Sequence, residues 1–177
     1  MPLVKDGQVV ADSYLRGPDE ATVPEDAAVI VPAARLLADA GALTKRAAPL
    51  GVLWPNDRRI AELAPYLDRI ALVALVFPNF RDGRAYSQAR LLRERYRFRG
   101  ELRATGQVLR DQFLFLLRAG FDSFEVVKSA DAASFSDAVR RYSVFYQPAA
   151  DGQLPAFRRR AVALQTGSAR PPMEHVR

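Results

Sequence analysis

The stretch IALVALVFPNFRDGRAYSQARLLRERYRFRGELRAT, residues 70–105, decides the fold. It begins with a near-continuous apolar run, typical of a strand that is covered on both faces. A polar turn follows, and then Ala85, Ala89, Leu92 and Tyr96 recur at helical spacing before a second strand begins near Gly100. A strand, a helix and a strand in this order predict two parallel strands joined by a right-handed crossover.

The same pattern recurs on both sides of this stretch. Residues 51–55 and 122–127 read as strands, residues 57–67 and 107–119 read as helices, and a further helix is expected from Ser134. Four such units between residues 49 and 147 predict an α/β fold, with a mainly parallel sheet flanked by helices. The sequence leaves two arrangements open, an open sheet with helices on both faces and a sheet that curls into a partial barrel. We favour the open sheet, because four or five strands cannot close an eight-stranded barrel.

The two ends of the chain look different from this regular middle. The first dozen residues predict a small hairpin that turns at Asp6 and Gly7, and a polar connection follows to residue 28. Residues 148–177 lose periodicity and gain basic residues, proline, glycine and serine. We therefore expect a single α/β domain over residues 1–147 and a basic, mobile tail over residues 148–177.

Composition excludes several kinds of chemistry. The chain of 177 residues has no cysteine, which removes thiol catalysis, thiolate metal sites and disulfides. Its one histidine, His175, lies close to the C-terminus, where it is poorly placed for acid–base work. No nucleotide-binding, hydrolase or zinc-protease motif is present, so we expect neither a cofactor nor a metal site. We expect a cytoplasmic protein, since neither a leader nor a membrane span is evident.

The positive charge is concentrated in one segment. Residues 81–118 contain ten arginines and four acidic residues, and this excess equals the net charge of +6 for the whole chain. Such a segment attracts anions, acidic protein surfaces or nucleic acid. We do not expect nucleic-acid binding, because no recognised signature surrounds the arginines.

Candidate site residues gather where the predicted strands end. Ligands of parallel α/β sheets bind beyond the carboxyl ends of the strands. The residues expected there to hold a small oxyanion or phosphate are Arg81, Arg84, Arg103, Thr105 and Gly106. Asp82 and Glu125, together with Asp57, are weak candidates for a carboxylate set that holds magnesium or does acid–base work. The alternative is that these residues only cap helices, ease turns and carry solvated charge.

The predicted helix over residues 107–119 is apolar around much of its circumference. Phe113, Phe115 and Leu117 cannot all face one sheet. Either a second layer covers this helix, or it is a surface for a partner protein or for a second copy of the chain.

Long motifs in the chain resemble those of a bacterial family, the domain of unknown function 934. The motifs are DGRAYSQARLLRERY, RGELRA, VLRDQ and GFDSFE, within a similarity that covers residues 29–147. The resemblance implies a role linked to assimilatory sulfite reduction, because members are typically encoded beside sulfite reductase. The functional residues of the family are not established, so the resemblance assigns none here.

Two functions follow as expectations. The first is an accessory protein of sulfite reduction that binds an oxyanion, or sulfite reductase itself, through the arginine-bearing strand ends and the apolar helix. The alternative is a small enzyme that acts on an anionic or phosphorylated substrate, with Arg81, Arg84 and Arg103 as a clamp and Glu125 or Asp82 as the acid–base group.

Overall fold

A computed structural model describes residues 1–17, 23–126, 135, 138 and 142–165. It contains an eight-stranded sheet with the order β2-β1-β8-β7-β6-β5-β4-β3. The strands are β1 (Leu3–Lys5), β2 (Gln8–Val10), β3 (Leu15–Arg16), β4 (Val29–Pro32), β5 (Leu50–Trp54), β6 (Leu72–Phe77), β7 (Glu101–Gly106) and β8 (Ser123–Glu125).

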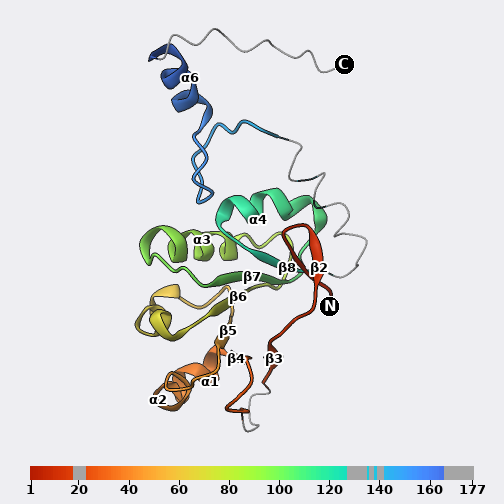
Figure 1. Ribbon diagram of the computed structural model, residues 1–177, viewed down its shortest axis with the longest axis vertical. Helices are drawn as coiled ribbons and strands as arrows, with labels where there is room; N and C mark the ends of the chain where they lie inside the picture. The colour runs from red at the N-terminus through yellow and green to blue at the C-terminus, as the bar shows by residue number, and fades with distance from the viewer. Residues whose placement is uncertain (18–22, 127–134, 136–137, 139–141, 166–177) are drawn as a thin grey trace.

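Helices and helical turns connect these strands (Figure 1). The α-helices are α1 (Ala33–Ala38), α2 (Ala40–Leu43), α3 (Arg84–Arg90), α4 (Phe113–Ala119) and α6 (Ala156–Gln165). The 3-10 turns are η1 (Ile60–Glu62), η2 (Ala64–Arg69) and η4 (Arg110–Gln112), and a π-helical turn, η3 (Leu91–Arg95), continues α3. The segment predicted as a helix from Ser134 falls largely outside the described residues, as does His175.

The predicted α/β class and the N-terminal hairpin are confirmed, but the sheet is mixed rather than mainly parallel. Strands β3 to β8 run parallel to one another. The hairpin of β1 and β2 is part of the same sheet, because β1 also pairs antiparallel with β8. The prediction missed this pairing because the hairpin closes locally, and its sequence alone does not reveal which strand it joins.

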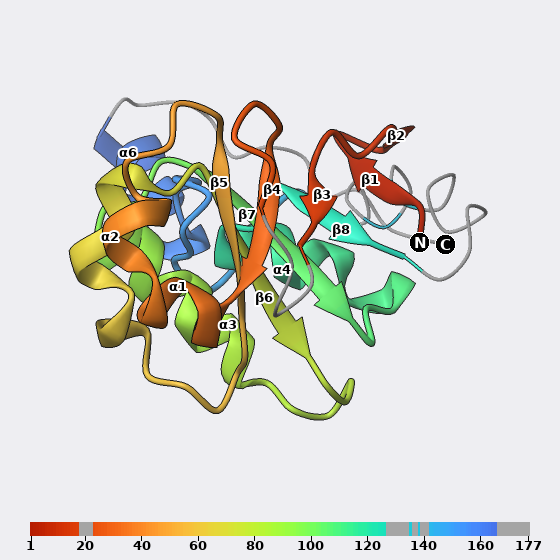
Figure 2. The same ribbon diagram turned by 90° about the horizontal axis from the view of Figure 1, so that it is seen from below.

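The expected open sheet with helices on both faces is also wrong. Strands β3 to β8 lie side by side in chain order, without the reversal that sends helices to both faces of a doubly wound sheet. Right-handed crossovers that always advance in one direction place their helices on one face. The sheet therefore curls into a half-barrel with α1, α3 and α4 outside, and β3 comes round to lie near β8 (Figure 2).

Two different interiors result from this curl. Between the sheet and the helices lies the main hydrophobic core, in which Trp54, Phe77, Phe113 and Phe124 are fully buried. On the inner, concave face the apolar cluster is much smaller and consists of Ile30, Leu72 and Ala74 with Tyr14 and Leu53 against them. The remaining part of the concave face is polar, and it is described below.

Tight backbone contact between strands explains one glycine. At the end of β7, Gly106 has a φ of 94°, and a Cβ atom there would lie 2.4 Å from the carbonyl oxygen of Phe77 at the end of β6. Only glycine fits both constraints. In the part of the chain that the structure describes, no helix is long and apolar enough to cross a membrane.

Candidate functional site

Polar side chains from β7 and β8 line the concave face of the half-barrel. Alternate residues of a strand point to opposite faces, so Leu102 and Ala104 enter the main core while Arg103 and Thr105 point inward. Ser123 and Glu125 point inward from β8 by the same alternation. Arg103 is 1% exposed and Glu125 is 5% exposed, so these charges are removed from water.

The Arg103 guanidinium is surrounded by carboxylates. Its Nη1 donates to Oδ2 of Asp12 at 2.7 Å, and its Nε and Nη2 donate to Oε1 of Glu101 at 3.2 and 3.1 Å. Oε1 of Glu125 lies 3.5 Å from Nη1, and the Tyr14 ring lies 5.7 Å from the guanidinium carbon. A buried cation needs such partners, because desolvation is otherwise too costly.

Glu125 on β8 links the last of the parallel strands to the first, β3. Its Oε2 accepts a hydrogen bond of 2.7 Å from the Thr105 hydroxyl on the neighbouring strand. Its Oε1 forms an ion pair with Arg16 of β3, although four strands separate β3 from β8 in the sheet. This ion pair spans the inside of the half-barrel.

Six charged residues thus form one neutral cluster, which we call the inner cluster. It consists of Lys5, Arg16 and Arg103 with Asp12, Glu101 and Glu125.

Protonation follows from these contacts. Burial raises the pKa of Glu101, but the hydrogen bond from Ser123 and the charge of Arg103 outweigh burial, and the net pKa is lowered. Burial lowers the pKa of Arg103, whereas Asp12 and Glu101 raise it, with a raised pKa as the result. Burial and the nearby charge of Glu101 raise the pKa of the Tyr14 phenol. Glu101 and Arg103 are therefore charged, and Tyr14 is neutral, at neutral pH.

The loop after β6 carries the other predicted arginines. Arg84 donates from Nη2 to Oδ2 of Asp82 at 2.6 Å, and Arg81 lies over the Phe80 ring at 5.4 Å. The hydrogen bond from Arg84 holds the pKa of Asp82 well below its usual range. The backbone N–H of Arg84 also donates to Asp82 at 3.2 Å, but the N-cap of α3 is Gly83 and no side chain caps this helix, so Asp82 lies one residue before the cap position.

The structure brings only some of the predicted site residues together. Arg103, Thr105 and Glu125 meet on the concave face. Among the contacts of the described residues, none joins Arg81 or Arg84 to Arg103. The described part of the chain also contains no group of three or more acidic or histidine side chains that could hold a metal ion, although Asp57, Asp82 and Glu125 all lie within it.

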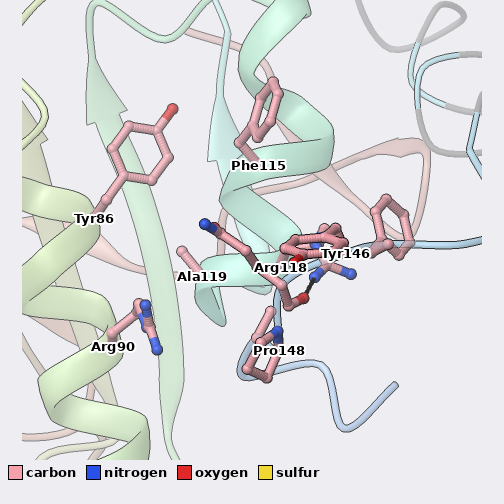
Figure 3. A pocket seen from close by; sticks show the side chains of 10 residues that line it. Tyr86, Arg90, Phe115, Arg118, Ala119, Tyr146 and Pro148 are labelled. Atoms are coloured by element: carbon pink, nitrogen blue, oxygen red, sulfur yellow. Dashed lines mark hydrogen bonds between the residues drawn. The ribbon is translucent and has the colours of Figure 1, made fainter. Parts of the chain in front are cut away.

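A groove lies on the opposite, helical side of the molecule (Figure 3). It has a volume of about 590 Å³ and is bounded by α3, by α4 and by residues 145–149. Tyr86 and Arg90 line one wall, Phe115 and Arg118 the other, and Tyr146 stands at its rim. Burial raises the pKa of Tyr86 to about 12, so its phenol stays protonated.

Arg118 holds the third wall of this groove, residues 145–149, in place. Its Nη1 donates to Asp151 at 2.8 Å, its Nη2 donates to the carbonyl oxygen of Gln147 at 2.7 Å, and its guanidinium lies 3.7 Å from the centre of the Phe145 ring. One arginine of α4 therefore docks the segment that leads to α6.

The three predicted partner-surface residues have different positions. Phe113 is fully buried against Phe124 and Phe135. Leu117 is partly buried against the main core. Phe115 is 64% exposed and lines the groove.

Comparison with known proteins now gives the family. The profile of the family described as bacterial protein of unknown function (DUF934) matches residues 51–157. The chain belongs to the DUF934 family. No curated protein matches the chain.

The matched region contains half of the inner cluster and the whole groove. Within DUF934 residues 51–157 lie Glu101, Arg103 and Glu125, as well as all ten residues that line the groove. Lys5, Asp12 and Arg16 precede the match. Glu101, Glu125 and Arg103 therefore each have a partner from a part of the chain outside the matched region.

Sequence reasoning missed four of the six residues of the inner cluster, namely Lys5, Asp12, Arg16 and Glu101. Asp12, Tyr14 and Arg16 come from a short, mostly exposed segment whose sequence shows no motif. The one available signal was the alternation of polar and apolar residues in ELRAT and SFE, at residues 101–105 and 123–125. A strand with polar residues on one face indicates either solvent or a polar interior on that side.

Proposed function

We propose that this DUF934 protein is a cytoplasmic accessory protein of assimilatory sulfite reduction that binds sulfite reductase through the groove. The observation that carries the proposal is the exposure of large aromatic side chains there: Phe115 is 64% exposed and Tyr146 is 82% exposed. Aromatic residues and arginine are enriched at the centres of protein–protein interfaces. The link to sulfite reduction rests on the family resemblance, which implies a gene next to that of the reductase.

The charge of the groove wall favours an acidic and partly apolar partner segment. Arg90 on α3 is 52% exposed on its side chain and pairs with Glu94 at 3.0 Å, and the excess of positive charge over residues 81–118 equals the net charge of the chain. Opposite charge on the partner would speed encounter and fix its orientation. Aromatic contact in the groove would then supply most of the affinity.

The concave face supports oxyanion binding as a second part of this function. It offers Arg103, Thr105 and Ser123, although each of these already has a partner within the protein. The same convergence supports the alternative, a small enzyme acting on an anionic or phosphorylated substrate with Glu125 as the acid–base group. A third possibility is that the groove binds a second copy of the chain.

Affinity purification from the native host tests the docking proposal. The wild-type protein should recover a sulfite reductase subunit, and Phe115→Ala together with Tyr146→Ala should abolish the recovery. Leu109→Ala is the matched control, because Leu109 is 44% exposed but does not line the groove. Recovery that is equal for all variants, or absent for the wild type, together with unchanged growth on sulfate after deletion, would contradict the proposal.

Thermal stability measured with added ligands distinguishes the enzyme alternative from the docking proposal. The panel contains sulfite, sulfate, phosphate, nucleotides and flavins, because a ligand present far above its dissociation constant stabilises the folded state. Under the enzyme alternative one of these raises the unfolding temperature, and Thr105→Val on the concave face weakens the effect. An unchanged unfolding temperature with every compound would count against an enzyme of this kind. Light scattering tests self-association.

A further inference from the structure

The inner cluster is covered by a short segment that could leave it. Residues 11–14, which we call the strap, connect β2 to β3 across the concave face. Asp12 and Ser13 are exposed, whereas Arg103 beneath them is 1% exposed. The strap is fastened over the cluster by side chains: Asp12 binds Arg103, and Tyr14 lies over the same guanidinium.

Asp12 differs from the other two carboxylates of the inner cluster. Glu101 and Glu125 stand on central strands of the sheet and are fixed by backbone pairing. Asp12 belongs to no strand, its side chain is 31% exposed, and its Oδ1 accepts a local hydrogen bond of 3.1 Å from the backbone N–H of Tyr14, which belongs to the strap itself. It is nevertheless the partner at the shortest distance from Arg103, at 2.7 Å. Asp12, the carboxylate with the weakest anchorage, therefore accepts the shortest of the hydrogen bonds that the buried Arg103 donates.

The charge balance of the inner cluster determines which ligand can replace the Asp12 carboxylate. With Asp12 in position, three cations face three carboxylates. Without it, the cluster carries one uncompensated positive charge, which is costly in a buried site. One small monoanion restores neutrality. The space that one carboxylate vacates limits this anion to a carboxylate, or a sulfur or phosphorus oxyanion, of similar size.

We propose that Arg103 is the core of an oxyanion-binding site in which Asp12 acts as an internal, displaceable ligand. A small oxyanion would accept hydrogen bonds from Nη1 of Arg103, next to the cation of Arg16, while the strap moves outward with Asp12. Charge-assisted hydrogen bonds of this type are among the strong ones. An internal competitor acts at high effective concentration, so it weakens anion binding in the resting protein.

This inference deepens the oxyanion-binding part of the proposed function and does not depend on docking at the groove. It also separates Arg103 from Arg81 and Arg84, which the sequence grouped as one clamp. Arg84 is engaged by Asp82 in the exposed loop after β6, far along the chain from the strap.

Replacement of Asp12 tests the site. Asp12→Ala empties the carboxylate position, Asp12→Asn fills it with a neutral amide, and Asp68→Ala removes an exposed carboxylate in η2 as the control. Thermal unfolding of the full chain is measured in sodium chloride, and again with formate or sulfate replacing chloride at constant ionic strength. In sodium chloride, Asp12→Ala should unfold at a lower temperature than the wild type. Formate should raise its midpoint by about 5 °C more than that of the wild type or the control.

Asp12→Asn keeps the test decisive if Asp12→Ala does not fold in chloride. Its midpoint should respond to formate by less than half as much as that of Asp12→Ala, because the amide blocks the position. A response to sulfate as well as formate would extend the site to tetrahedral oxyanions, and a response to formate alone would restrict it to carboxylates.

Two results would overturn the inference. Equal stabilisation of all four proteins would mean that the anion binds elsewhere, and oxyanion binding as a function would survive. No stabilisation of any of them would reject both the Arg103 site and oxyanion binding itself, while docking at the groove would still stand.

Discussion

At the scale of single residues, buried hydrogen bonds supply partners to the carboxylates of the inner cluster. Thr105→Val keeps the shape of the side chain but leaves Oε2 of Glu125 without its hydroxyl donor in a site that is 5% exposed. We expect a loss of about 1–3 kcal/mol in the free energy of unfolding, measured by urea titration. Thr105→Ser retains the hydroxyl and should lose less. A Val variant as stable as the wild type would show that this hydrogen bond contributes nothing.

The free energy of unfolding should also fall at acid pH, and the size of this fall should depend on Ser123. The folded protein lowers the pKa of Glu101 below the ordinary value of 4.5, so the unfolded chain binds protons more readily. The resulting stabilisation is present above pH 4.5 and is lost as the pH falls through the folded value. Ser123→Ala removes the 2.7 Å hydrogen bond that favours the charged form.

Urea titrations between pH 7 and pH 3 test this pH dependence. At pH 7 the wild type should be more stable than Ser123→Ala by about 2 kcal/mol, and the difference should shrink below pH 4.5. Ser87→Ala, at an exposed serine of α3, serves as the control. A difference between wild type and Ser123→Ala that stays constant down to pH 3 would contradict the explanation.

At the scale of elements, α4 shows how one helix serves both core and surface. Phe113 is fully buried between two other phenylalanine rings, at centroid distances of 5.3 and 5.5 Å, whereas Phe115, two residues later, is 64% exposed. Phe113→Ala should cost about 3–5 kcal/mol of unfolding free energy, and Phe115→Ala less than about 0.5 kcal/mol. Thermal and urea unfolding check both values. A large loss for Phe115→Ala would mean that its ring packs in the core.

The elements show what the sequence can and cannot specify. Periodicity predicted β6, β7 and the helix from residue 83 to 96, because each has a regular apolar face, although the last turn of that helix is π-helical. Periodicity could not predict that the sheet curls with its helices on one side, because strand order depends on contacts between distant segments. For the same reason it placed Arg103 with Arg81 and Arg84, when its partners are Asp12 and Glu101.

At the scale of the whole molecule, the half-barrel separates two surfaces with different chemistry. The concave face is charged, internally paired and covered by the strap. The helical face carries the aromatic groove, whose third wall is held in place by Arg118. This separation allows anion binding and partner docking to be tested with variants that do not overlap.

The central claim is that the groove binds sulfite reductase, and a titration with the two purified proteins tests it most directly. We predict saturable binding by the wild type, at least tenfold weaker binding by Phe115→Ala, and unchanged binding by Leu109→Ala. Binding that is absent for the wild type, or equally strong for Phe115→Ala, would contradict the claim.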